Sequence, residues 1–238
     1  MAIYLCHTQP DLYEHTATVT DAAPGRVALS KSAFHPGGGG QVSDVGSIET
    51  RGGAFEVTHM EVAGDDWWHV LADDTAELSG DVTVRVDAEH RRRVASLHTM
   101  SHVLNAFVFE EFAGSLVTGA QIYGDGTGRM DFDLSAIDND CLRALEMPVN
   151  DVIGQELDVA AIYVPADEAD TNPGLVRSLS VAPPPTPDGE LRLIDIEGVD
   201  RQACGGSHLS NTGQAVGFKI GKIENKGKRN RRIRFSLP

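Results

Sequence analysis

Residues 87–114 have the sequence DAEHRRRVASLHTMSHVLNAFVFEEFAG, and this stretch decides the fold of the second half of the chain. Its apolar residues recur every three or four positions, which is typical of a helix packed against a core. Asp87 is a suitable N-cap and Gly114 a suitable stop, so we expect one long helix from Ala88 to Ala113. The apolar positions are Val94, Leu97, Val103, Leu104, Phe107, Val108 and Phe112.

The residues before this helix follow a different pattern. Up to about residue 86 they form short runs of alternating apolar and polar residues, separated by Gly, Asp and Pro. Such runs predict a small antiparallel barrel or sandwich. The fold class is therefore α+β, with a β-barrel domain at residues 1–86 and a second domain at residues 87–238.

The residues after the long helix mix strands and helices without regular alternation. Strand-like runs occupy residues 120–123 and 129–134, and a second helix is expected from about Asn139. We expect Pro148 to end or kink that helix, because proline cannot donate to the helical hydrogen-bond ladder. Near the C-terminus, residues 216–224 and 231–237 are expected to form a closing pair of strands.

The composition indicates a soluble cytoplasmic protein. Three cysteines, Cys6, Cys141 and Cys204, are too few for a disulfide scaffold and favour a reducing compartment. The sequence has no apolar run of about 20 residues, so no membrane partner is expected. The N-terminus lacks the order of regions that defines a signal peptide.

Charge is distributed unevenly along the chain. The formal net charge is −15, yet residues 219–238 contain eight Lys or Arg and one acidic residue. A uniformly acidic protein would repel phosphates, whereas a concentrated basic segment can still bind them. We expect the remaining acidity to reflect adaptation to a salt-rich cytoplasm, and solubility alone is the alternative. The candidate nucleic-acid contacts in this segment are Lys226, Lys228, Arg229, Arg231 and Arg232.

Two pairs of residues have the spacing of metal ligands. His98 and His102 are four residues apart, which places both imidazoles on one face of the predicted helix. Cys204 and His208 are also four apart, in the glycine-containing motif CGGSH. Three imidazoles and one thiol form a ligand set that suits Zn²⁺, so we predict one zinc ion per chain. The spacing leaves open whether the ion is structural or catalytic.

Four longer motifs follow one another along the chain: FHPGGGGQVSDVGSI (34–48), HTMSHVLNAF (98–107), TGAQIYGDGTGRMDFDL (118–134) and DRQACGGSHLSNTGQAVGFKIGKIENKGKRNRRIRF (200–235). In this order they resemble the editing domain of alanyl-tRNA synthetases and their free-standing relatives, the AlaX family. The resemblance covers nearly the whole chain, and nothing in the chain corresponds to an aminoacylation module.

The resemblance implies hydrolysis of the ester that joins serine or glycine to alanine tRNA, acting on tRNA that another enzyme has mischarged. It implies His98, His102, Cys204 and His208 as zinc ligands. It also implies that the hydroxyls of Ser101 and Thr118 lie near the amino-acid pocket. Such a hydroxyl could form a hydrogen bond to the side-chain hydroxyl of serine, which alanine lacks. We expect main-chain amides, with Gly205 and Gly206 as candidates, to stabilise the developing oxyanion, and residues Gly38, Gly39, Gly40 and Gln41 to lie near the tRNA end.

Two other functions remain open at this point. A zinc-stabilised RNA-binding module without catalysis would bind charged and uncharged tRNA equally. A zinc hydrolase of another aminoacyl ester would act without tRNA. The sequence leaves the choice between serine and glycine and the oligomeric state undetermined.

Overall fold

The computed structural model describes residues 3–64, 66–135, 139–179, 186 and 188–238, and the chain divides into two compact units. Unit 1 consists of Met1–Gly38 and Val42–Arg92, and unit 2 of Gly39–Gln41 and Arg93–Pro238. The domain boundary expected at residues 86/87 stays a prediction, since this division falls inside a helix at residues 92/93. The short segment Gly39–Gln41 belongs to unit 2 although unit 1 surrounds it in sequence.

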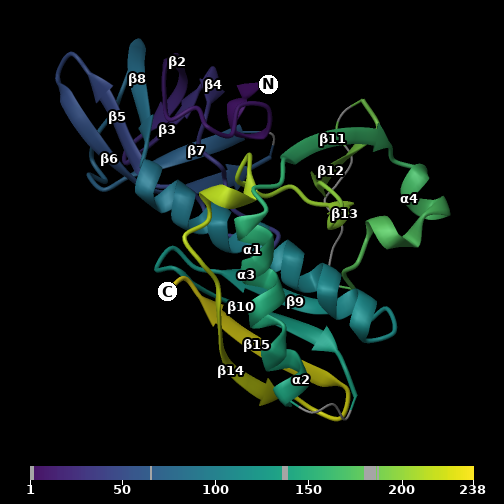
Figure 1. The fold of residues 1–238 in the computed structure, drawn as a ribbon. Coiled ribbons are helices and arrows are strands. Elements are labelled where there is room, and N and C mark those ends of the chain that lie inside the picture. The colour runs from purple at the N-terminus through teal and green to yellow at the C-terminus, as the bar shows by residue number, and fades with distance from the viewer. Residues whose placement is uncertain (1–2, 65, 136–138, 180–185, 187) are drawn as a thin grey trace. The chain divides into compact units, whose positions relative to one another are not determined.

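Unit 1 is a closed barrel of six antiparallel strands, as the alternating pattern predicts (Figure 1). The order around the barrel is β2-β3-β7-β6-β5-β8. In β8, for example, the alternate residues Val82, Val84 and Val86 are buried, as expected of side chains that face the inside of a barrel. The strands are β2 (Glu14–Ala23), β3 (Arg26–Leu29), β5 (Gly46–Thr50), β6 (Gly53–Ala63), β7 (Asp66–Leu71) and β8 (Asp81–Val86).

A short pair of strands lies outside the barrel. β1 (Ile3–Tyr4) pairs in parallel with β4 (Lys31–Ser32), and the chain then enters a 3₁₀ turn over Leu5–His7. The 3₁₀ turn buries Cys6, which is 1% exposed.

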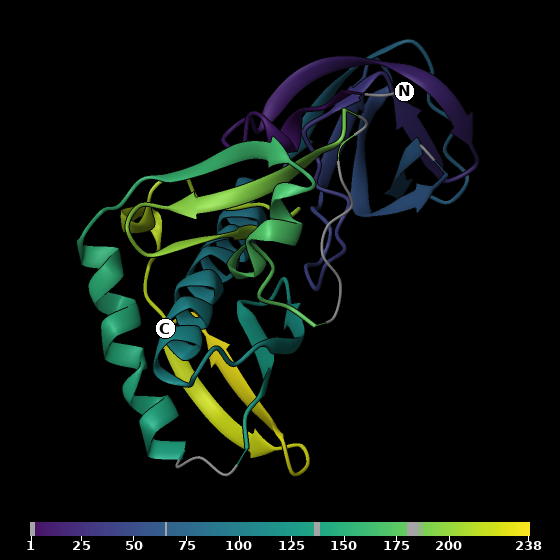
Figure 2. The same cartoon turned by 90° about the vertical axis from the view of Figure 1, so that its right-hand side faces the viewer.

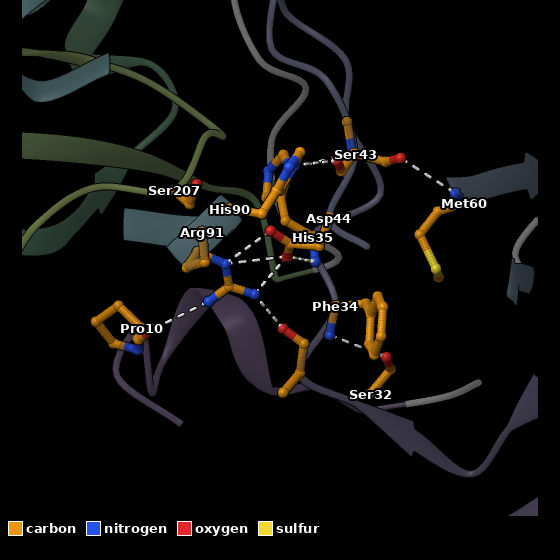
Figure 3. A network of polar contacts seen from close by, with 12 residues as sticks. Pro10, Ser32, Phe34, His35, Ser43, Asp44, Met60, His90, Arg91 and Ser207 are labelled. Carbon is orange, nitrogen blue, oxygen red and sulfur yellow. Dashed lines mark hydrogen bonds and ion pairs between the residues drawn. The ribbon is translucent and has the colours of Figure 1, made fainter. Parts of the chain in front are cut away.

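A buried ion pair joins the glycine-rich loop to the barrel end of helix α1 (Ala88–Glu111) within unit 1 (Figure 3). Both oxygens of Asp44 accept from Arg91, and the guanidinium also donates to the carbonyls of Ala33 and Pro10. Arg91 is 2% exposed and Asp44 is 1% exposed. Moving the two side chains apart would leave a buried charge without a partner, which is costly. The pair therefore fixes the path of residues 33–44 at the start of α1.

Helix α1 is the central element of unit 2 (Figures 1 and 2). Asp87 caps it by accepting from the N–H groups of Glu89 and His90, both at 2.9 Å. Every residue from Val94 to Ala106 is buried, because both sheets of unit 2 and helix α3 (Glu146–Gly154) lie around this part of the helix. The helix ends two residues earlier than expected, and Gly114 follows in the left-handed region with a φ of 75°.

Two antiparallel sheets complete unit 2. One has the order β14-β15-β10-β9 and includes the predicted C-terminal pair, and the other has the order β11-β12-β13. These strands are β9 (Val117–Ile122), β10 (Thr127–Asp133), β11 (Val159–Pro165), β12 (Glu190–Ile196), β13 (Asp200–Ala203), β14 (Lys219–Asn225) and β15 (Asn230–Ser236). The α+β fold class, with a barrel before the second region, is thus confirmed.

The second helix is interrupted just before Pro148, as expected. The chain forms α2 (Asn139–Ala144) and α3 (Glu146–Gly154), and the break lies at Leu145. In an unbroken helix the residue at position 148 would donate to the carbonyl of Ala144, but proline has no N–H and its ring would collide with that carbonyl. The interruption therefore lies where Pro148 should produce it, and Pro148 itself sits in the first turn of α3, where no N–H is needed.

The remaining helical elements are short: α4 (Glu168–Thr171) and 3₁₀ turns at Pro173–Leu175 and Thr212–Gln214. Within the described part of the chain, every helix is too short or too polar to cross a membrane.

Candidate metal centre

The two predicted ligand pairs meet inside unit 2. Helix α1 presents His98 and His102 one turn apart, and the loop after β13 presents Cys204 and His208. One ligand atom from each of the four residues lies within 4.8 Å of the other three. The fold therefore brings together residues about a hundred positions apart in the sequence, as the predicted metal site requires.

The distances within this cluster fit a tetrahedral zinc ion. At usual bond lengths such an ion separates its sulfur and nitrogen ligands by about 3.5 Å. The Sγ atom of Cys204 lies 3.5 Å from Nε2 of His98 and 3.3 Å from Nε2 of His208. Three nitrogens and one sulfur also match the donor types that zinc prefers, so the residues present fit the metal.

The electrostatics of the cluster favour a thiolate. Burial alone would raise the pKa of the Cys204 thiol, but the surrounding imidazoles of His98, His208 and His102 hold it well below its usual value. Burial lowers the pKa of His102, yet Cys204 and Asp200 outweigh this effect and raise it to about 9. Burial and His98 hold the pKa of His208 well below its usual value. The thiolate is the form of cysteine that binds metals.

Each of the three imidazoles is held at its other ring nitrogen. The Nδ1 atom of His98 lies 2.7 Å from Oε1 of Gln41, and that of His102 lies 3.1 Å from Oδ2 of Asp200. The Nδ1 atom of His208 lies 3.3 Å from Oγ1 of Thr99, which also accepts from the Leu209 N–H. Such partners orient a metal-binding imidazole and make Nε2 available to the ion.

Further polar groups hold these partners and the CGGSH loop in place. Gln202 and Arg177 both contact the carboxylate of Asp200, at 2.6 and 2.9 Å. Arg192 donates to the carbonyls of Cys204 and Gly206, at 2.6 and 3.1 Å. Sequence reasoning did not single out these supporting residues. Thr99, Asp200 and Gln202 lie within the two ligand motifs, but their spacing to the ligands does not reveal the contact. Arg177 and Arg192 lie outside the motifs.

Gly206 allows the loop to approach α1. A Cβ atom at this position would lie 2.1 Å from Cε1 of His98 and 2.7 Å from Oε1 of Gln41. The Gly206 N–H points to Sγ of Cys204 at 3.4 Å, a common arrangement around a thiolate. Stabilisation of an oxyanion by the amide of Gly205 stays a prediction, whereas the N–H of Gly206 is already used in this contact.

The two predicted specificity hydroxyls lie in different settings. Ser101 is buried in α1 and donates to the carbonyl of His98 at 2.7 Å, so its oxygen can only accept further bonds. Thr118 is half-buried in β9, and its Oγ1 accepts from Nδ2 of Asn230 at 3.1 Å. Thr118 therefore keeps its own proton for donation, whereas Ser101 does not.

The glycine-rich segment is built for close backbone approach. Gly37, Gly38, Gly39 and Gly40 all have positive φ values, between 60° and 101°. A Cβ at Gly40 would lie 2.5 Å from the carbonyl oxygen of Ala120, whereas Gly38 and Gly39 have open space at that position. Gln41, expected near the tRNA, is 3% exposed and lies beside His98.

The basic segment forms β14, β15 and the turn between them, and acidic side chains of unit 2 partly neutralise it. Arg229 and Arg232 each form two hydrogen bonds to one carboxylate, that of Asp133 and Asp131 respectively. Arg231 is 8% exposed and donates to Oδ1 of Asn225 at 2.9 Å. Lys226 lies 4.0 Å from Glu224, and Lys228 is exposed and forms no ion pair within the described residues.

Comparison with known proteins gives a consistent result. The family model for the threonyl and alanyl tRNA synthetase second additional domain matches residues 191–234. The chain is 36% identical over 236 residues to the alanyl-tRNA editing protein AlaX-M of Methanosarcina mazei, covering 95% of this chain and 92% of that protein. It is 39% identical over 220 residues to AlaX-M of Methanosarcina acetivorans, covering 89% of this chain and 88% of that protein.

A longer enzyme contains a similar segment. The chain is 31% identical over 223 residues to the alanine–tRNA ligase of Korarchaeum cryptofilum, which covers 91% of this chain but only 24% of the ligase. The relatives therefore include both a protein of this length and one part of a larger synthetase.

We predict that Cys204→Ala lowers the zinc content well below one ion per chain, because the thiolate is the softest ligand of the set. Elemental analysis of the purified protein measures this content. Cys141→Ala is the matched control, since Cys141 is exposed and outside the cluster, and it should leave zinc unchanged. Full zinc content in the Cys204 variant would contradict the assignment of this loop as a ligand.

Proposed function

We propose that this chain, which belongs to the AlaX family of alanyl-tRNA editing proteins, hydrolyses the ester between serine or glycine and alanine tRNA. The similarity along nearly the whole length of AlaX-M carries this proposal. The four-residue cluster supports it, because its ligands come from two distant segments, whereas structural zinc knuckles usually take theirs from compact local turns.

The proposed metal is zinc, held by His98, His102, Cys204 and His208. When bound, zinc supplies a Lewis acid that polarises a carbonyl or activates a water molecule. The protein's contribution is to hold the three imidazoles by their Nδ1 atoms and to keep Cys204 as a thiolate. In this proposal main-chain amides bind the developing oxyanion. The amides of Gly206 and Ser207 are excluded from that role, because their N–H groups already point to Sγ of Cys204 and to Oε1 of Gln41.

Thr118 is the better candidate for recognising misattached serine. Its oxygen already accepts from Asn230, so its proton is directed to another acceptor, and the hydroxyl of a seryl group can be that acceptor. Alanine has no such hydroxyl and would leave the Thr118 proton without a partner. Ser101 contributes as an acceptor at most, because its proton is used within α1.

The proposed tRNA contacts lie on the basic segment, with the lysines as the main candidates. The chain has only five lysines, and four of them, Lys219, Lys222, Lys226 and Lys228, lie between residues 219 and 228. Lys222 is 74% exposed in its side chain, and Arg229 is 76% exposed. Exposed cations of this kind position a phosphate backbone without reading its sequence.

A deacylation assay tests the proposed function directly. We expect hydrolysis of serine- or glycine-charged alanine tRNA, little hydrolysis of alanine-charged tRNA, and loss of activity after removal of zinc by a chelator. Binding of tRNA without hydrolysis would favour an RNA-binding module instead. Equal turnover of a free aminoacyl ester would favour a hydrolase that does not need tRNA.

For Thr118→Val we expect retained zinc and a reduced preference for seryl-tRNA over alanyl-tRNA. The loss of one buried hydrogen bond should reduce discrimination by about 1–3 kcal/mol. The ratio of kcat/KM for the two substrates measures it. Thr127→Val is the control, because Thr127 is exposed and its hydroxyl donates to Asp125. An unchanged ratio would move the specificity role away from Thr118.

For the triple variant Lys219→Gln, Lys226→Gln and Lys228→Gln we expect weaker tRNA binding and a flatter dependence of log affinity on log salt. Each lost phosphate contact should reduce the slope by somewhat less than one unit. The rate at saturating tRNA should change little, since phosphate contacts position the substrate. Lys31→Gln, which alters the one lysine outside the segment, is the control. An unchanged slope in the triple variant would exclude these lysines.

A further inference from the structure

Gln41 connects the two segments that carry the candidate metal ligands. It was expected to contact nucleic acid, but it is 3% exposed and reaches both α1 and the CGGSH loop. We infer that Gln41 is a positioning residue for the metal centre: its amide fixes the ring state of His98 and holds Ser207, next to His208. This inference rests on the proposed metal centre and concerns residues of unit 2 alone.

The polarity of the contacts fixes which end of the Gln41 amide faces the cluster. The backbone N–H of Ser207 can only donate, and it points to one atom of the amide at 3.0 Å. That atom must be the carbonyl oxygen Oε1, because the amide nitrogen cannot accept. The orientation of the glutamine therefore follows from the backbone of the loop.

This orientation determines the tautomer of His98. Oε1 of Gln41 also lies 2.7 Å from Nδ1 of His98, and because an oxygen acceptor faces it, Nδ1 must carry the hydrogen. A neutral imidazole carries only one such hydrogen, so Nε2 keeps its lone pair. Nε2 is the atom that faces Cys204 at 3.5 Å, which is the position required of a metal ligand.

The other end of the amide holds the loop. Nε2 of Gln41 donates to Oγ of Ser207 at 2.8 Å, so Ser207 is bound through both its N–H and its hydroxyl. Ser207 stands between Gly206 and the ligand His208. A single side chain thus sets the spacing between a ligand on α1 and a ligand pair about a hundred residues later.

The backbone around Gln41 makes this side chain a firm support. Gln41 pairs with Ile122 of β9 as an isolated parallel bridge, and the Gly40 carbonyl accepts from the Ile122 N–H at 2.6 Å. The strand passes so close to Gly40 that a Cβ there would lie 2.5 Å from the Ala120 oxygen. Gln41 is therefore anchored to a sheet rather than carried on a free loop.

The test is zinc affinity, measured on the full-length metal-free protein by competition with a chromophoric chelator. Gln41→Met keeps the length of the side chain but removes its polar atoms, so zinc affinity should fall about 10- to 100-fold. Gln41→Glu keeps an oxygen acceptor for His98 and for the Ser207 N–H, and it should bind zinc within threefold of the parent. The absorption spectrum of bound Co²⁺ should change in the Met variant, because one imidazole is no longer held.

Gln121→Met is the matched control. Gln121 is a half-buried glutamine on β9 whose side chain donates to the carbonyl of Ile122, and among the described residues it forms no hydrogen bond to a candidate ligand. The zinc affinity of this variant should therefore stay within twofold of the parent. Circular dichroism and thermal melting of the metal-free variants check that each is folded. If Gln41→Met fails to fold, Gln41→Asn replaces it, since the same amide on a stem one methylene shorter cannot reach both segments.

Three results would overturn the inference. The first is a Gln41→Met or Gln41→Asn variant that binds zinc within twofold of the parent. The second is a Gln41→Glu variant whose zinc affinity is as low as that of either of these variants, and the third is a loss of zinc affinity in Gln121→Met equal to that in Gln41→Met. Failure of the proposed function looks different. If the parent protein itself binds no zinc, the metal centre and this inference both fall. If the parent binds zinc and hydrolyses mischarged tRNA while Gln41→Met binds zinc equally well, only the role of Gln41 is wrong.

Discussion

Burial of three imidazoles beside a thiol is the constraint on which the rest of unit 2 depends. A buried ring nitrogen that carries hydrogen needs a partner, because water cannot reach it. The fold supplies three such partners from three separate segments: Gln41 from the glycine-rich segment, Asp200 from β13 and Thr99 from α1 itself. Helix α1 is accordingly enclosed on all sides from Val94 to Ala106, with polar groups placed where its ligands emerge.

Glycines let these segments come close enough to form the cluster. Any side chain at Gly206 would collide with His98, and any side chain at Gly40 would collide with the backbone of β9. One glycine in each motif is therefore required for steric reasons that do not depend on substrate binding. Gly40 brings Gln41 against β9, and Gly206 brings the Cys204 loop against α1, so the two close approaches serve one arrangement.

The basic segment shows how tertiary structure changes the meaning of charge along a chain. The surplus of Lys and Arg in residues 219–238 is real in the sequence, but Asp131 and Asp133 on β10 pair with Arg232 and Arg229 across the sheet. Arginine, with its planar fork, is used for these pairs within the protein. Lys222 and Lys226 share the carboxylate of Glu224, whereas the exposed Lys219 and Lys228 form no ion pair among the described residues. Lysines bind phosphates as mobile point charges.

The sequence by itself determined the barrel, the long helix, both ligand pairs and the family, because each depends on local periodicity or on a short motif. Only the tertiary structure decided which polar residues support the ligands, as with Gln41 and Asp200. A hydrogen bond between residues 57 or 98 positions apart leaves no periodic signal in the chain. The interruption before Pro148 is local by contrast, because proline acts on the carbonyl only four residues earlier, and the sequence alone was enough to predict it.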